Sequence, residues 1–330
     1  MSVEPANPLP KNKASTTAVG ILCAMGAWFL FSLNDAGIKF LSGDYALHQI
    51  VLIRSVTAII ITLTILIPLE GGYSLLKTRH PFTHIVRGLC VVVANMAFFM
   101  GLASISLPEA SAIFFIAPLF ITALSVFLLG EKVGQKRWAA VLVGLIGVII
   151  MLRPGTSAFQ YAALLPLFAA LAYAFMQILT RKLGIKEKAS TMAFYIQLMF
   201  IIVCAAFGYL FGDGRYANPG NQSLNFLFRA WTHPDAKDLL IMVAIGVSSG
   251  FGGYLVSQAY RLCEATIIAP FEYMALVLAI FWGITIWGEW PDSVAWAGIL
   301  LIFGSGLYVF WREVLLDKKF VIRHPMPRNR

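Results

Sequence analysis

Three charged side chains lie inside long apolar runs of the sequence, where a charge is costly to keep. Asp35, Arg54 and Glu272 are each embedded in stretches rich in Ala, Leu, Ile, Val and Phe. A charge in hydrocarbon costs roughly 3 kcal/mol or more, so each of these residues is a candidate for a functional role. A carboxylate in such a place can bind and release a proton, whereas Arg keeps its charge and has to face a partner or a water-filled cavity.

Each charge also has a purely structural interpretation. Asp35 and Lys39 are four residues apart, so on a helix they share a face and can neutralise each other. Alternatively, Asp35 and its neighbour Asn34 form a polar patch at the outer mouth of a cavity and contact a ligand. Arg54 and Glu272 can likewise pair with each other, or Glu272 can bind a ligand or a proton. The sequence leaves both sets of alternatives open.

Amide, aromatic and proline residues occur in the same apolar runs. Among the amides, Asn95 is the best placed for a central cavity, at about 20 Å from the end of its helix for a rise of 1.5 Å per residue. Pro118 and Pro270 each remove a backbone donor and are expected to interrupt the helix that contains them. Four aromatic residues near polar positions are candidates for stacking on a planar ligand: Trp28, Tyr173, Tyr254 and Tyr273.

One motif raises the question of an enzyme. Residues 246–250, Gly-Val-Ser-Ser-Gly, fit the G-x-S-x-G pattern of a nucleophile elbow, which belongs on a strand-to-helix turn. Here the motif lies within an apolar run, where it also fits the G-x-x-x-G pattern of close helix packing. The sequence has no phosphate-binding loop, no H-E-x-x-H and no C-x-x-C. We therefore expect no catalytic residues, no metal site and no bound cofactor.

Composition indicates that these residues lie in a membrane. Of the 330 residues, 59% are hydrophobic and 12% are charged, about half the charged fraction of a typical soluble protein. The mean hydropathy is +0.79. Because about 20 apolar residues are needed to span a bilayer as a helix, the sequence predicts an all-α membrane protein with ten transmembrane helices. The expected spans are 18–41, 46–67, 82–103, 109–129, 137–152, 161–181, 190–211, 238–260, 265–287 and 293–312.

The basic residues predict an orientation. With ten spans, 19 of the 25 Lys and Arg residues fall on the side that contains both termini, and 4 fall on the other side. The positive-inside rule then places the tails 1–17 and 313–330 in the cytoplasm and the long loop 212–237 outside. The same rule accounts for the net charge of +9, so we expect no nucleic acid as a partner.

The two halves of the chain repeat a pattern. Leu107-Pro108-Glu109-Ala110 leads to Gly130-Glu131, and Leu262-Cys263-Glu264-Ala265 leads to Gly288-Glu289. In both cases Trp-Ala begins seven residues after the second Glu. The first Gly-Glu loop is basic and the second is acidic, so the two loops are expected on opposite sides of the membrane. Two five-helix repeats of inverted topology, enclosing a central cavity, satisfy this pattern.

This arrangement resembles the drug/metabolite transporter superfamily, EamA-type, from about residue 18 to 312, with repeats at 18–152 and 161–312. The stretch 32–39 and the positions of Arg54 and Arg87 resemble a branch that includes bacterial riboflavin and S-adenosylmethionine transporters. The second half departs from many relatives, because Met274 and Leu276 stand where a further proline is common.

The resemblance implies a secondary transporter that moves a small organic metabolite across the bacterial inner membrane by alternating access. Riboflavin uptake is the first expectation for the substrate, and S-adenosylmethionine uptake or export of amino acids or other metabolites is the alternative. A channel-like or scramblase protein is the alternative of another class. The expected partners are a small molecule and the lipid bilayer, with a homodimer left open. The expected cavity residues are Asn34, Asp35, Arg54, Asn95, Tyr254, Glu272 and Tyr273, with Pro118 and Pro270 as helix interruptions and Glu272 as the proton-coupling candidate.

Overall fold

The computed structural model describes residues 13–78, 80–130, 134–156, 160–183, 189–262 and 271–323, and all regular structure within them is helical. Seven helices in these ranges are long and apolar enough to cross a membrane, and three further apolar helices are shorter. The α-helices are α1 (Lys13–Leu41), α2 (Leu47–Ile61), α3 (Ile67–Glu70), α4 (Pro81–Leu102), α5 (Leu107–Phe114), α6 (Ala117–Leu129), α7 (Gln135–Leu152), α8 (Leu164–Leu183), α9 (Ala189–Phe211), α10 (Gln222–Phe228), α11 (Ala236–Leu262), α13 (Met274–Trp287) and α14 (Ser293–Arg323).

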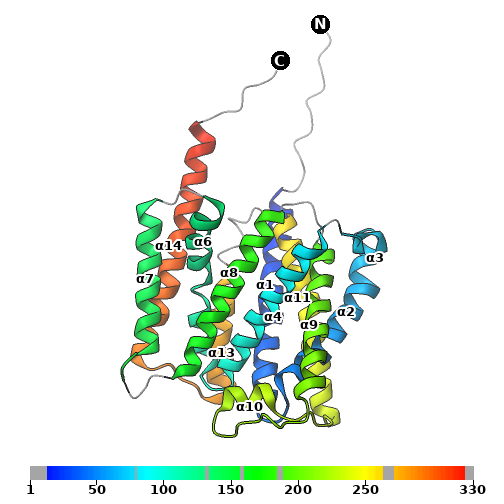
Figure 1. The fold of residues 1–330 in the computed structure, drawn as a ribbon. Coiled ribbons are helices and arrows are strands. Elements are labelled where there is room, and N and C mark those ends of the chain that lie inside the picture. The colour runs from blue at the N-terminus through cyan, green and yellow to red at the C-terminus, as the bar shows by residue number, and fades with distance from the viewer. Residues whose placement is uncertain are drawn as a thin grey trace.

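The long helices run along one common axis and form a single bundle (Figure 1). Helix α1 begins and helix α14 ends at the same end of the bundle, which we call the terminal side. Helix α10 lies at the opposite end, which we call the α10 side. Helix α14 continues to Arg323, into the segment that the sequence assigned to a tail, and α1 already begins at Lys13.

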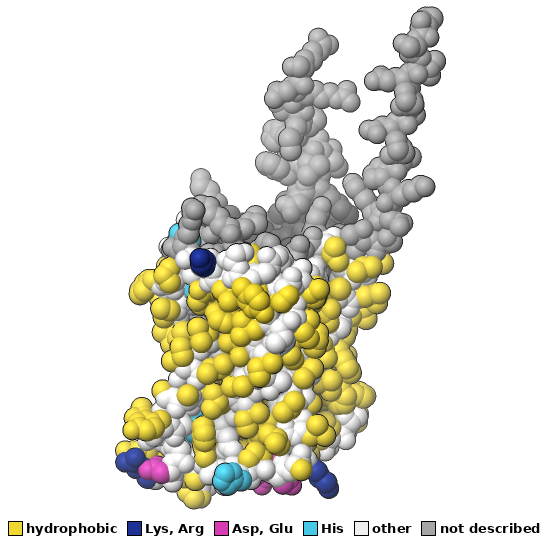
Figure 2. Space-filling model, turned by 90° about the vertical axis from the view of Figure 1, so that its right-hand side faces the viewer, with side chains coloured by type: hydrophobic (Ala, Val, Ile, Leu, Met, Phe, Trp, Pro, Cys, Tyr) yellow, Lys and Arg dark blue, Asp and Glu magenta, His cyan; other side chains and the backbone are white. Residues whose placement is uncertain are grey.

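Apolar side chains cover the flank of the bundle between its two ends, and charged side chains lie at the edge on the α10 side (Figure 2). Phe127 is 75% exposed, and Ile60 and Leu142 are more than half exposed. Apolar exposure of this extent is unusual for a soluble protein and is covered by lipid in a membrane protein. The membrane setting expected from composition is therefore confirmed.

The predicted break at Pro118 is present. Helix α5 ends at Phe114 and α6 begins at Ala117, because Pro118 has no N–H to continue the hydrogen-bond ladder of α5. Helix α6 ends at Gly130, whose φ of 69° lies in the left-handed region that glycine adopts without strain.

A similar interruption occurs in the second half of the chain. Phe271 and Glu272 are helical, Tyr273 lies in a turn, and α13 begins at Met274. Helix α13 ends at Gly288 with φ 66°, again in the left-handed region. Pro270, predicted to cause this interruption, lies outside the described residues.

The stretch directly after α2 has a form that the sequence did not predict. Residues Thr62–Leu66 form a π-helix between α2 and α3, a wider turn that interrupts the i→i+4 pattern and is common at functional sites. The Thr62 hydroxyl donates to the carbonyl of Ala58 at 2.8 Å.

The long loop 212–237 is folded rather than open, since it contains α10. The amide of Gln49 donates to the Thr232 carbonyl at 2.6 Å, and Gln49 Oε1 accepts from the Thr232 N–H at 3.3 Å. Arg229 Nη1 donates to the Ser42 carbonyl at 3.1 Å. These bonds hold the loop against the first turn of α2 and against the turn between α1 and α2.

Candidate functional site

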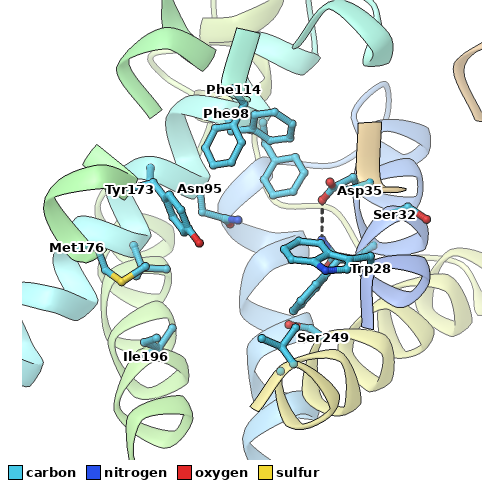
Figure 3. A pocket seen from close by; sticks show the side chains of 18 of the residues that line it. Trp28, Ser32, Asp35, Asn95, Phe98, Phe114, Tyr173, Met176, Ile196 and Ser249 are labelled. Carbon is cyan, nitrogen blue, oxygen red and sulfur yellow. Dashed lines mark hydrogen bonds between the residues drawn. The ribbon is translucent and has the colours of Figure 1, made fainter. Parts of the chain in front are cut away.

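A cavity of about 480 Å³ lies among the long helices and is lined by residues from both halves of the chain. Its volume is within the range of small-molecule binding sites. Asn34, Asp35 and Arg54 reach it from α1 and α2, and Asn95 reaches it from α4. Figure 3 shows Asn95 and Tyr173 on one side of the cavity, with Asp35 and Trp28 on the other.

A continuous chain of hydrogen bonds forms the polar wall of this cavity. Asn34 Nδ2 donates to Asp35 Oδ1 at 3.1 Å, and Arg54 Nη1 donates to Asn34 Oδ1 at 3.4 Å. Arg54 Nη2 donates to Asn95 Oδ1 at 3.2 Å. One neutral amide, that of Asn34, therefore connects the carboxylate to the guanidinium, and a second, that of Asn95, accepts from the other end of the guanidinium. These four residues form what we call the amide-linked wall.

Aromatic rings line the remaining surface. The ring of Phe114 lies edge-on to Phe98 at 5.3 Å and near Tyr173 at 5.5 Å between centroids. The Arg54 guanidinium lies 4.9 Å from the centre of the Phe200 ring. Gln177 donates to the Tyr173 hydroxyl at 2.7 Å, which fixes that ring. A site that combines fixed aromatic rings with a few oriented polar groups suits a molecule with a planar ring and charged or polar substituents.

The structure brings together most, but not all, of the residues that the sequence predicted to face the cavity. Five of the seven line it, Asn34, Asp35, Arg54, Asn95 and Glu272, and Pro118, predicted as a helix interruption, lines it as well. Tyr254 and Tyr273 are not among the described residues that line it. Tyr273 is 7% exposed and packs between the rings of Phe115 and Phe303, at 5.5 and 5.0 Å. Its ring therefore fills the contact with α14 instead.

The interpretation that Asp35 and Lys39 neutralise each other is also wrong. Lys39 Nζ lies 2.5 Å from Glu289 Oε1 and also donates to the Ile105 carbonyl at 3.3 Å. Glu289 Oε2 accepts from the Leu107 N–H at 2.9 Å. Lys39 lies in the last turn of α1, at the α10 side. Glu289 comes from the loop after α13, and the sequence pattern did not predict that the two residues would meet. Asp35 lies one turn deeper and faces the cavity.

Arg54 and Glu272, for which the sequence offered a direct pair as one alternative, line the same cavity. The hydrogen bonds of Arg54 go to the amides of Asn34 and Asn95. Glu272 lines the same cavity and lies beside Tyr273, at the interruption that precedes α13.

Several lining residues were not predicted. Phe98, Phe114, Phe115 and Phe200 face the cavity, but the chain has 25 Phe residues and helical periodicity does not separate rings that face a cavity from rings that face lipid. Ser32, another lining residue, accepts from Trp282 Nε1 at 3.1 Å. Only the fold brings that pair together, since 250 residues separate the two.

The G-x-S-x-G residues lie on α11 and form a packing face. A Cβ placed on Gly246 would lie 2.5 Å from Thr57 Cβ and 2.8 Å from the Arg54 carbonyl oxygen, so the backbones of α11 and α2 are in close contact. The strand-to-helix turn of a nucleophile elbow is not present at these residues. Among the described residues, no group of three or more His, Cys, Asp or Glu is placed to hold a metal.

Comparisons with known proteins agree on one family. The chain is 28% identical to the S-adenosylmethionine uptake transporter of Rickettsia prowazekii over 92% of this chain and 96% of that protein. It is 27% identical to the riboflavin transporter of Vibrio cholerae, over 88% and 92% of the two chains. It is 28% identical to the pseudopaline exporter of Pseudomonas aeruginosa, over 86% and 93%.

A solved crystal structure shares the fold, with a TM-score of 0.59 and 20% identity over 94% of this chain and 99% of the other. The sequence model described as the EamA-like transporter family matches twice, at residues 18–153 and 160–311. The chain is therefore a multi-pass membrane protein and belongs to the EamA-like transporter family.

Proposed function

We propose that this protein is a secondary transporter that carries a small organic metabolite across the bacterial inner membrane by alternating access. The observation that carries the proposal is the cavity itself, which has a polar wall, aromatic sides and contributions from both halves of the chain. Transporters built from inverted repeats place their substrate at such an interface between the halves.

The proposal includes ten spans in two inverted repeats. The interruptions at Phe115 and Tyr273 precede Gly130 and Gly288 by the same number of residues, and their rings stack on each other at 5.5 Å with 26° between planes. The two matches of the family model also divide the chain near its middle. The shared position of the start of α1 and the end of α14 suits an even number of spans (Figure 1). The excess of Lys and Arg on this side favours its placement in the cytoplasm.

The charges of the cavity favour a substrate that carries charge. Asp35, Glu272 and Arg54 all line it, and a substrate with cationic and anionic groups could use all three. We therefore place S-adenosylmethionine first, since it combines an aromatic base with a sulfonium, an ammonium and a carboxylate. Riboflavin, the first expectation from the sequence, stays the second candidate. The rings of Phe98, Phe114 and Tyr173 favour a planar system, although a neutral flavin would use none of the three charges.

Glu272 remains our candidate for proton coupling. It lies at a helix interruption and lines the cavity, so its surroundings change when the helix segments on either side move. Asp35 has to be considered beside it, because the lysine expected to keep Asp35 ionised is bound to Glu289 instead.

Uptake by the purified full-length protein in proteoliposomes tests the proposal. Radiolabelled S-adenosylmethionine and riboflavin are each offered with and without an excess of the unlabelled compound. A carrier gives saturable uptake and counterflow, in which unlabelled substrate trapped inside accelerates entry of the label. Uptake that rises linearly with concentration and shows no counterflow would support a channel instead. Movement of fluorescent lipid between leaflets would support a scramblase.

A further inference from the structure

Arg87 of α4 is a buried cation with unused hydrogen-bond donors. The residue is 5% exposed, and its Nε and Nη1 atoms have no hydrogen-bond partner among the described residues. A buried charge is normally paired, because an unpaired one strongly destabilises the fold. Arg54 provides the contrast, since amides of Asn34 and Asn95 accept from its two terminal nitrogens.

The position of Arg87 relates it to the cavity. Val91, Ala94, Asn95 and Phe98 of α4 line the cavity. Arg87 precedes Val91 by four residues, so it continues the same face of the helix about 6 Å nearer the terminal side. Arg87 and Asn95 are two turns apart, about 12 Å along the axis, and Asn95 is the residue that binds Arg54. Arg87 is not itself among the lining residues, and it lies on the same face of α4 one turn beyond Val91.

Contacts with α9 fix this part of α4. The ring of His84 stacks on Tyr195 at 4.7 Å between centroids. A Cβ on Gly88 would lie 2.5 Å from Cγ of Met199, so the two helices pack tightly on either side of Arg87 in the sequence. The Arg87 backbone is thus held in place while part of its guanidinium is left without a partner.

We propose that Arg87 is a second anion-binding residue of the transport pathway, on the terminal side of the cavity, and that it binds a carboxylate or phosphate group of the substrate. The planar guanidinium matches the two oxygens of such a group with parallel hydrogen bonds. Arg87 then contacts the anionic group as the substrate passes between the terminal side and the amide-linked wall. This inference rests on the proposed transport function.

Thermal unfolding of the full-length protein in neutral detergent gives the first test. Arg87→Met removes a buried charge while keeping the length of the side chain. We expect this variant to melt at a higher temperature than the unmodified protein. Inorganic phosphate should raise the melting temperature of the unmodified protein and not that of Arg87→Met. Arg215→Met is the matched control and should keep the phosphate response, since Arg215 is exposed and paired with Asp213 at 2.7 Å.

Two results of this test would overturn the proposal. One is a phosphate response of Arg87→Met equal to that of the unmodified protein. The other is a lower melting temperature of Arg87→Met without phosphate, since it would show that the guanidinium is already satisfied within the fold. Arg87→Lys, which keeps the charge without the fork, is expected to retain a weaker phosphate response.

Binding of S-adenosylmethionine and its decarboxylated analogue gives the second test, in phosphatidylcholine vesicles. Arg87→Met should bind S-adenosylmethionine about tenfold more weakly and the decarboxylated analogue equally well. Equal losses for both compounds would overturn the assignment to a substrate carboxylate. A lipid as the source of the anionic group would also overturn it. In that case phosphatidylglycerol raises the melting temperature of the unmodified protein, and Arg87→Met binds the two compounds with the same preference as the unmodified protein. If the unmodified protein binds neither compound, the proposed substrate fails, whereas the phosphate test still decides the role of Arg87.

Discussion

Two regions at different depths of the bundle use charge in different ways. On the α10 side, Lys39 and Glu289 form an ion pair at 2.5 Å, and Glu289 also accepts from the Leu107 N–H. In the cavity, the charges of Asp35 and Arg54 are joined only through the amide of Asn34, at 3.1 and 3.4 Å. The first arrangement connects α1, the start of α5 and the end of α13 directly. In the second arrangement, a group of the substrate can replace the Asn34 amide as the hydrogen-bond partner of Asp35 or Arg54.

The comparison separates a closing contact from a binding surface. Asp35 and Lys39 lie on the same helix only four residues apart, yet Asp35 lines the cavity and Lys39 pairs with Glu289 on the α10 side. A direct charge pair that is 9% and 24% exposed gains strength from its low-dielectric surroundings. Displacing the Lys39–Glu289 pair would cost a substrate much free energy. The long hydrogen bonds to the Asn34 amide are weaker and easier to replace. The following predictions test this division.

The largest expected effect comes from breaking the closing contact. Glu289→Gln leaves Lys39 with its charge largely buried and without its acid, which should destabilise the protein by roughly 3 kcal/mol. Denaturant or thermal unfolding of the purified protein measures this loss. Asp213→Asn is the matched control: the Arg215–Asp213 pair is exposed, and its loss should be barely measurable.

A charge exchange sharpens the same prediction. Lys39→Glu combined with Glu289→Lys should recover part of the lost stability. The recovery is incomplete because a lysine at position 289 cannot accept from the Leu107 N–H. If the exchanged protein is no more stable than the single variants, the ion pair is not what holds the α10 side closed.

Next in size is the effect of removing the guanidinium of the amide-linked wall. Arg54→Lys keeps the charge but cannot reach both Asn34 and Asn95 with one planar fork. We expect uptake at low substrate concentration to fall about tenfold, corresponding to about 1.4 kcal/mol. Initial rates in proteoliposomes measure the loss, and the melting temperature should change little. An equally large loss of stability would contradict a role in binding.

A smaller effect distinguishes the two acids of the cavity. We expect Glu272→Gln to make uptake independent of pH between about 5 and 8, while exchange of substrate continues in part. Asp35→Asn should weaken apparent affinity a few-fold and keep the pH dependence. Uptake and exchange measured at several pH values give the pH dependence and the apparent affinity of each variant. The opposite result would transfer the coupling role to Asp35, and pH-independent uptake by the unmodified protein would make the carrier a facilitator.

The smallest effect concerns an exposed pair on the α10 side. The hydrogen bond from Arg153 holds the pKa of Asp292 below its usual range. A lowered pKa stabilises the folded state above the unfolded pKa of about 4, and this contribution is lost as the pH falls through the lowered value. Asp292→Asn should therefore cost about 0.5 kcal/mol at pH 7, as is typical of surface pairs. The difference in melting temperature from the unmodified protein should shrink below about pH 4.

Periodicity and composition predicted the helical class and most helix positions, because lipid imposes long apolar runs that are visible in the sequence. The interruption at Pro118 was predicted for the right reason. The π-helix at Thr62–Leu66 was not, since it depends on packing rather than on a residue type with a known preference. Helix α10 was also missed, because seven residues within a polar loop give little periodicity.

The charged residues of the candidate site were predictable, because the free-energy cost of a charge in the membrane is enough to identify them. Asp35, Arg54 and Glu272 were found because an intramembrane charge is expensive, and all three line the cavity. The partners of these charges were not predictable, since Glu289 reaches Lys39 across 250 positions of the chain. The ring contacts of Tyr273 were not predictable for a similar reason, because Phe303 comes from helix α14.

The close approach of α11 to α2 at Gly246 has a consequence for motion. With Thr57 and the Arg54 carbonyl directly against α11 at Gly246, the two helices have little room to slide past each other there. On the microsecond-to-millisecond timescale of collective helix movements, this pair is expected to be displaced as one rigid body. Rearrangement is then expected at places where the helical ladder is interrupted, such as Phe115 and Tyr273. Arg54 is accordingly expected to move with α2 and α11, whereas Glu272 lies at the interruption that precedes α13.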